Sequence, residues 1–233
     1  MSVLAQIADR LHFSFICASA ARRVQRRVAA SRPEGSAPLA GAPLQLHGKV
    51  ADAEWVEAPL TGARVVGYRV LVETIGHYWM NRRVLVDHCV VGDFTLEGAG
   101  GAHRVRGEHG RLIVADPCSQ GRRAGGSAEE PKGFPDAVSA VLANRVQVRL
   151  EAQDPRHYRW HEYHLHEGDE VFVDGAWEHK GEGNAPLNIA GARARPLLVS
   201  NIPREVLLRD LSAPNEALMR VLPRMHSLVD RDL

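Results

Sequence analysis

The sequence has few of the features that mark a disulfide scaffold, a membrane-spanning protein or a nucleic-acid-binding surface. Its 233 residues contain only three cysteines, Cys17, Cys89 and Cys118, which are far apart and odd in number. No disulfide framework is therefore predicted, and a reducing compartment is favoured. No apolar run approaches the ~20 residues that a membrane-spanning helix needs. The formal net charge of +1 indicates neither nucleic acid nor an acidic substrate as a partner.

The first 30 residues form the basic part of the chain. Apolar residues recur there at helical spacing and arginines cluster near the end, at Leu4, Ile7, Leu11, Phe15, Arg22, Arg23, Arg26 and Arg27. This pattern predicts an amphipathic helix over residues 1–30. Two interpretations stay open: the helix packs on the protein body or on a second copy, or it lies on an anionic membrane surface. Residues 31–45 have the composition of a Pro/Gly/Ala linker.

Residues 46–211 are predicted to form one domain of short strands, followed by a helical tail over 212–233. In the clearest strand of the first half, Val66, Tyr68, Val70 and Val72 alternate with a face that holds Gly67, Arg69 and Glu73, which predicts a half-buried strand. Further strands are predicted over 81–89, 93–96, 111–115, 145–152, 158–166, 170–177 and 196–201. A short helix is predicted over 134–143, and the glycines between 98 and 110 are assigned to turns. Residues 121–133 are predicted to be a flexible loop.

The expected fold class is therefore α+β and mainly β. Short strands separated by turn residues, with helices at the N- and C-terminal ends, indicate an antiparallel small barrel or a curled sheet.

One histidine-rich segment is a candidate metal site. His164 and His166 are two residues apart, so both point to the same side of a strand, and Glu170 follows a turn. This spacing resembles part of the first metal motif of the cupins, and imidazole and carboxylate are suitable ligands for Fe, Mn, Ni or Zn. The alternative is that these are ordinary solvent-facing strand residues. No second cupin motif is found, so no cofactor is expected, and a metal-dependent cupin-like enzyme is kept as an alternative.

Other functional templates are weaker. The sequence has no Gly-x-Ser-x-Gly elbow, no phosphate-binding loop and no helical His-Glu-x-x-His motif. Trp55, Trp79, Trp160 and Trp177 have the residue type of stacking platforms for single-stranded nucleic acid, and with near-neutral charge they also suit core or rim packing. An OB-like nucleic-acid-binding module is therefore a second alternative.

Several short motifs, taken in order, resemble a known domain. They are His47-Gly48-Lys49-Val50, Pro59-Leu60-Thr61-Gly62 with the strand to Glu73, Asp93-Phe94-Thr95-Leu96, Gly110 to Pro117, Tyr158 to Glu162, and Glu167 to Gly175. This order is similar to that of the BAM (beside a membrane) domain, found in GIDE-type E3 ubiquitin ligases of the mitochondrial outer membrane and in many bacterial proteins. The residues that carry the motifs structurally are Gly48, Pro59, Gly62, Tyr68, Gly168, Asp169 and Gly175.

The resemblance implies a β-rich binding or sensing domain next to a membrane, without a catalytic residue of its own. A RING needs about eight Cys and His ligands, which three isolated cysteines cannot supply, so ligase activity is not expected. The expected partner is an unknown protein or a membrane surface, contacted through the N-terminal helix, and homo-oligomerisation is an option. The expected location is cytoplasmic, with a peripheral position at the inner face of the membrane as a variant.

Overall fold

The computed structural model describes residues 26, 43–75, 82–123, 136–146, 157–178, 188–192 and 195–207. Within these ranges the chain is mainly β, as the sequence predicts. The elements are β1 (Pro43–Ala51), β2 (Val56–Glu57), β3 (Arg64–Val65), β4 (Gly67–Ile75), β5 (Arg82–Val91), β6 (Phe94–Gly98), β7 (Gly101–Val105), β8 (Gly110–Ile113), β9 (Ser119–Arg123), α2 (Asp136–Val146), β10 (His157–Leu165), β11 (Glu170–Glu178), β12 (Asn188–Ala190) and β13 (Leu197–Ser200).

Five strands close into a barrel in the order β1-β6-β7-β12-β11 and back to β1. All of these pairs are antiparallel except β7 with β12, which run parallel. Numbered by their order along the chain, the five strands follow the circular order 1-2-3-5-4, which is the Greek-key connectivity of the OB-fold. The predicted small barrel is thus confirmed, with one parallel pair in it. Strands β13 and β8 extend the sheet outward from β11.

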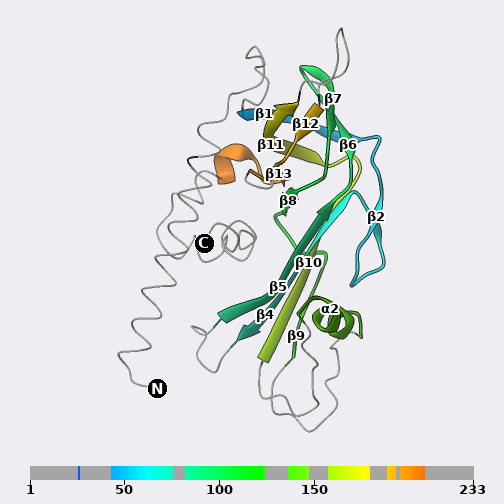
Figure 1. Cartoon of the computed structure of the whole chain (residues 1–233), viewed down its shortest axis with the longest axis vertical. Coiled ribbons are helices and arrows are strands. Elements are labelled where there is room, and N and C mark those ends of the chain that lie inside the picture. Colours follow the sequence, from blue (N-terminus) through cyan, green and yellow to red (C-terminus); the bar gives the residue numbers. More distant parts are fainter. Residues whose placement is uncertain are drawn as a thin grey trace.

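A second sheet, in the order β5-β4-β10-β9, is built from two insertions into the barrel. Strands β4 and β5 come between the first and second barrel strands, and β9, α2 and β10 come between the third and fourth. In Figure 1 the barrel occupies one end of the molecule and this sheet, with α2 beside it, occupies the other. The short hairpin of β2 and β3 precedes β4.

The burial of the two faces of β4 agrees with the sequence-based prediction for one face only. Tyr68, Val70 and Val72 are buried in a cluster with Tyr158 and Trp160 of β10, as their alternation predicts. The opposite face is also buried, since Arg69 is 1% exposed and Glu73 is 0% exposed. The prediction of a half-buried strand is therefore wrong. Leu71, on the same face as Arg69, belongs to the main core cluster that fills the barrel, so the second face of β4 is covered as well.

Burial of Arg69 is possible because it has a matched partner. Its Nε and one Nη donate to the two carboxylate oxygens of Asp87 on β5, at 2.9 Å and 3.0 Å. The guanidinium carbon also lies 6.0 Å from the ring centroid of Tyr163 on β10. Burial by itself lowers the pKa of Arg69, but the charge and hydrogen bonds of Asp87 outweigh it, so the pKa is raised and the guanidinium stays charged.

Several predicted boundaries are corrected. The predicted helix begins at Asp136 and continues to Val146, so residues 145–146 are helical and do not begin a strand; residues 147–152 lie outside the described ranges. Residues 121–123 belong to β9, not to a flexible loop. Gly101, one of the glycines assigned to turns, begins barrel strand β7 over residues 101–105. Strand β1 begins at Pro43, three residues before the predicted domain start at 46.

The predicted terminal helices are largely outside the described part of the chain. Of the predicted N-terminal contact residues only Arg26 is described, as an exposed helical residue, and the remainder of 1–30 and the tail over 212–233 are not. Residues 204–207 form a helical turn after β13. No helix in the described ranges has the length and apolar content needed to cross a membrane.

Steric constraints explain why glycine occupies three positions of the motifs that resemble the BAM domain. Gly168 has a φ of 90° in the turn between β10 and β11, a conformation that other residues rarely adopt. In the same turn the Asp169 carboxylate accepts a hydrogen bond from the His166 backbone N–H at 2.8 Å. A Cβ at Gly175 would lie 2.8 Å from Leu197 Cδ1, and a Cβ at Gly48 would overlap the Glu97 backbone. Gly168 therefore permits a turn, and Gly48 and Gly175 permit close approach of neighbouring residues, so all three have a structural role.

Candidate ligand-binding groove

The three predicted metal ligands do not form a ligand set. The ring centroids of His164 and His166 are 5.5 Å apart, but His164 is 6% exposed whereas His166 and Glu170 are exposed. The His164 Nε2 is 2.9 Å from the Glu162 carboxylate and is therefore occupied. Among the described residues no group of three His, Cys, Asp or Glu side chains is placed to hold a metal ion. The alternative interpretation, that all three face solvent, is also wrong for His164.

His164 instead belongs to a polar cluster around the buried Glu162 side chain, which we call the hairpin clamp: Leu60, Thr61, Glu162 and His164. Glu162, which is 0% exposed, accepts hydrogen bonds from the Leu60 backbone N–H at 2.7 Å and the Thr61 hydroxyl at 2.6 Å. The Glu162 Oε1 atom is also within hydrogen-bond distance of the His164 ring, 2.9 Å from its Nε2. A carboxylate that receives this many donors is satisfied, so the clamp joins the tip of the β2–β3 hairpin to β10.

The turn sequence explains why the hairpin reaches the clamp. Pro59 and Gly62 are its turn formers, and Gly62 has a φ of 69°. The Gly62 N–H donates to the Ala58 carbonyl at 2.8 Å and the Ala58 N–H donates to the Ala63 carbonyl at 2.9 Å, which closes the turn. The Thr61 hydroxyl donates to the carboxylate and also lies 3.3 Å from His164 Nε2, the same ring nitrogen that faces Glu162. In a catalytic triad the nucleophile and the acid contact different nitrogens of the histidine, so these contacts are those of a structural cluster.

The two described cysteines are free and differ in access. Burial raises the pKa of Cys89 to about 11, and the nearby Arg69 guanidinium offsets this only in part. Cys118 is exposed, and its pKa is raised mainly by partial burial. Since the thiolate is the nucleophile, a raised pKa slows alkylation at any pH below it.

Iodoacetamide at pH 8 is expected to label Cys118 in the folded protein and to leave Cys89 unlabelled. With a pKa of about 11, roughly one Cys89 thiol in a thousand is ionised at that pH, and the side chain lies against the core. Peptide mass spectrometry of a Cys17→Ser variant measures both sites. Cys89 should react once the chain is unfolded in guanidinium, and equal labelling of the two thiols in the native protein would contradict the assignment.

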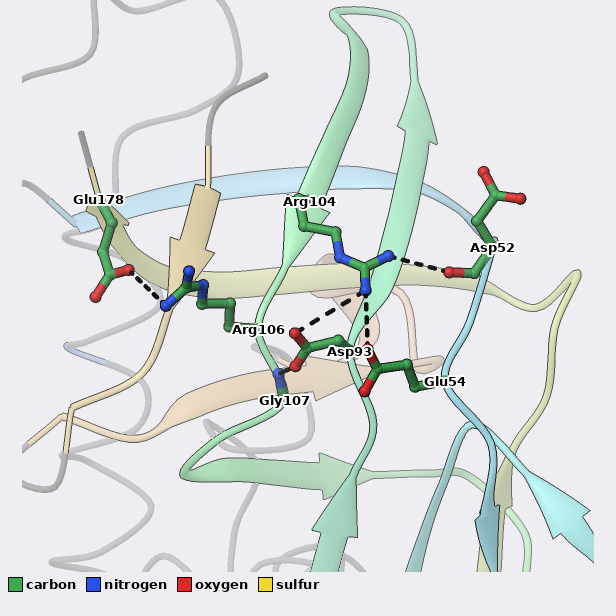
Figure 2. A network of polar contacts seen from close by, with 7 residues as sticks. All are labelled: Asp52, Glu54, Asp93, Arg104, Arg106, Gly107 and Glu178. Carbon is green, nitrogen blue, oxygen red and sulfur yellow. Dashed lines mark hydrogen bonds and ion pairs between the residues drawn. The ribbon is translucent and has the colours of Figure 1, made fainter. Parts of the chain in front are cut away.

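The outer face of β6 and β7, where OB-folds usually bind nucleic acid, carries two arginines that acidic residues already contact. Arg104 Nη2 lies 3.4 Å from Glu54 and 4.0 Å from Asp93, and Arg104 Nη1 donates to the Asp52 carbonyl at 3.2 Å (Figure 2). Arg106 lies 3.8 Å from Glu178. Figure 2 shows the Asp93 carboxylate between Arg104 and Gly107, and this carboxylate accepts a hydrogen bond from the Gly107 N–H at 2.9 Å. Both arginines on this face therefore already lie close to carboxylates.

The predicted stacking tryptophans divide into two groups. Trp160 and Trp177 are 3% and 5% exposed and pack in the two core clusters, and Trp79 lies outside the described ranges. Trp55 is 43% exposed and is the single large apolar side chain exposed in the described part of the chain. Trp55 lies at the base of the β2–β3 hairpin, and an exposed apolar side chain of this size is a candidate for ligand contact.

Trp55 lines an open groove of about 550 Å³ that we call the Trp55 groove. Its lining comes from the end of β1, the hairpin, β6 and the turn before β11: Lys49, Val50, Ala51, Trp55, Arg64, Glu97, His166, Glu167 and Gly168. The Arg64 guanidinium carbon lies 5.9 Å from the centroid of the Trp55 ring, a cation–π distance. The groove combines an apolar wall, two permanent cations and two carboxylates, a composition suited to binding a ligand.

Sequence reasoning identified Trp55 only as one of four tryptophans and did not identify Lys49 or Arg64. Lys49 and Glu97 are cross-strand partners between β1 and β6, and Arg64 comes from a separate hairpin, so no spacing in the sequence joins them. No protein-family model, curated protein or solved structure significantly matches this chain.

Proposed function

We propose that this protein is a non-catalytic binding or sensing module whose ligand site is the Trp55 groove. One observation carries the proposal: the exposed indole of Trp55 lies in a groove beside Arg64, which has no carboxylate within 4 Å in the described ranges. The residues with catalytic potential, by contrast, are bonded to one another in the hairpin clamp. The resemblance to the BAM domain of GIDE-type ligases supports the same class of function.

The two alternatives receive less support. A cupin-like metal enzyme needs His164, His166 and Glu170 to converge, and Glu162 occupies the His164 ring nitrogen that faces it. An OB-like nucleic-acid module gains from the barrel connectivity, but a fold does not determine a function. Such a module needs unpaired cations along a strand-tracking surface, whereas Arg104 and Arg106 lie against carboxylates.

The proposal includes an attachment through the N-terminal segment, whose apolar and arginine-rich pattern suits an anionic membrane or a protein partner. It places the protein in the cytoplasm, peripheral at the inner face of the membrane. The segment lies outside the described residues except for Arg26. Flotation with anionic liposomes, with and without residues 1–32, tests the membrane form of this proposal, and equal flotation of the two forms refutes it.

The binding role predicts that a ligand raises the melting temperature of the wild-type chain and not that of a Trp55→Ala/Arg64→Ala variant. A ligand that binds only the folded state stabilises it by about 2.7 kcal/mol at a hundredfold excess over its Kd. Differential scanning fluorimetry against separate anionic, cationic and neutral compound sets measures this. Arg106→Ala, outside the groove, is the matched control. The proposal fails if no set stabilises the wild type or if the double variant responds equally.

A further inference from the structure

We infer that the Trp55 groove binds a small anion attached to a planar ring, of nucleotide size or smaller. The inference rests on the proposed function and names its ligand class. The groove volume of about 550 Å³ is within the range of small-molecule sites, and its open mouth admits a ligand without rearrangement of the barrel. Three features of the lining determine the chemistry: the aromatic wall, the two cations and the two carboxylates.

The aromatic wall selects a planar group. Trp55 keeps 43% of its surface exposed, so much of its indole remains available for stacking. Arg64, whose guanidinium carbon is 5.9 Å from the ring centroid, adds a second planar group. Both planes stack readily on an aromatic ring, and a ligand that lacks one leaves the indole in water.

The two cations select a negative charge. Within the described ranges neither Lys49 nor Arg64 has a carboxylate oxygen within 4 Å, although Lys49 lies between Glu97 and Glu170 in the strand register. Arg64 has Glu57 as its cross-strand partner, but Glu57 does not line the groove. An anionic group placed between Lys49 and Arg64 would receive charge-assisted hydrogen bonds from both.

The two carboxylates limit the size of the anion. Glu97 and Glu167 also line the groove, so its permanent charges sum to zero before a ligand enters. A polyanion such as single-stranded nucleic acid would meet these carboxylates as well as the cations, and nucleic-acid affinity depends on neutralising several phosphates. A molecule with one phosphate or carboxylate can contact the cations and meets less of this repulsion than a polyanion does.

The lining is held in place before a ligand binds. Arg64 lies on β3, and Glu162 fixes the tip of that hairpin through Leu60 and Thr61. On the opposite wall, a Cβ at Gly168 would be 3.6 Å from Lys49 Cε, so the lysine stem lies against the turn before β11. A preorganised site loses less conformational entropy on binding.

Isothermal titration of the full chain with adenosine 5′-monophosphate tests the inference, with indole-3-acetate as the carboxylate counterpart. We expect saturable binding of at least one of them. Trp55→Ala and Arg64→Ala should each weaken it about tenfold, because each removes a stacking or charge-assisted contact. Trp55→Phe and Arg64→Lys should retain more of the affinity. Glu97→Gln/Glu167→Gln should strengthen it about threefold by removing repulsion.

Adenosine alone and inorganic phosphate alone separate the two parts of the ligand, and each should bind at least about tenfold more weakly than the joined molecule. Arg106→Ala should bind like the wild type, and circular dichroism confirms that every variant is folded. The inference is overturned if neither planar anion binds, if the groove variants bind equally, or if a single-stranded oligonucleotide binds more tightly than the monophosphate at physiological salt. Groove-dependent stabilisation by another compound class would then leave the proposed function standing.

Discussion

Replacing Arg69 by methionine is expected to lower the free energy of unfolding by about 3–5 kcal/mol, because the Asp87 carboxylate stays buried without its partner. Asp87 has 8% of its side chain exposed, and Arg69 supplies both of its close donors on this face. Urea unfolding followed by circular dichroism measures the loss. A loss below 1 kcal/mol would show that the pair is hydrated in solution.

A second variant keeps this prediction testable if the first does not fold. In Arg69→Met/Asp87→Leu both charges are gone, and apolar side chains of similar size occupy the space between the sheet and the barrel. Removing a whole buried pair is often neutral, so most of the stability should return. Arg106→Met is the matched surface control, since Arg106 is 38% exposed and its ion pair is at the surface.

Replacing Glu162 by leucine is expected to lower the free energy of unfolding by about 3 kcal/mol, because the buried His164 ring and two part-buried donors lose the carboxylate that they contact. The Leu60 backbone N–H and the Thr61 hydroxyl both lose their partner at once. Thermal and urea unfolding measure the effect. The loss of the clamp should also free the β2–β3 hairpin, so hydrogen exchange should increase at residues 56–65 more than in the barrel strands.

A double-mutant cycle with Thr61→Val separates the clamp from general packing. Thr61→Val alone removes one hydrogen bond and should cost about 1 kcal/mol, and in the Glu162→Leu background it should cost little or nothing. Additive losses, with no faster exchange over 56–65, would show that Glu162 acts elsewhere. Because the same hairpin carries Arg64, the clamp variants are also expected to weaken ligand binding in the Trp55 groove.

The sequence predicted which side chains of a strand share a face, but not whether distant parts of the chain bury that face. The spacing of Tyr68, Val70 and Val72 identified one buried face of β4, because strand side chains alternate regardless of context. It could not show that the other face is covered, since Leu71 meets a barrel assembled from distant strands. The sequence therefore placed Arg69 on a solvent-exposed face, although its ion pair with Asp87 makes its burial possible.

Composition misled the prediction where pairing overrides propensity. Gly101 begins β7, and the glycines around it suggested only turns, but the barrel register places residues 101–105 opposite β6. The candidate site had a similar limit. His164 and His166 are two residues apart, which suggested a shared metal ion. Glu162 is also two residues from His164 on the same strand, and its carboxylate contacts the His164 ring nitrogen. Neither the clamp nor the Trp55 groove follows from spacing, because each joins segments from different parts of the chain.

The order of the barrel strands has a consequence for folding. β1, β6 and β7 leave the ribosome early, but the barrel closes only when β11 and β12 arrive to pair with β1 and β7. The hairpin clamp has the same delay, since Leu60 and Glu162 are 102 positions apart. Loop closure over such distances makes folding slow, and until then the early strands present unpaired edges. The growing chain is thus most exposed to misassociation while the segment between β7 and β11 is being synthesised.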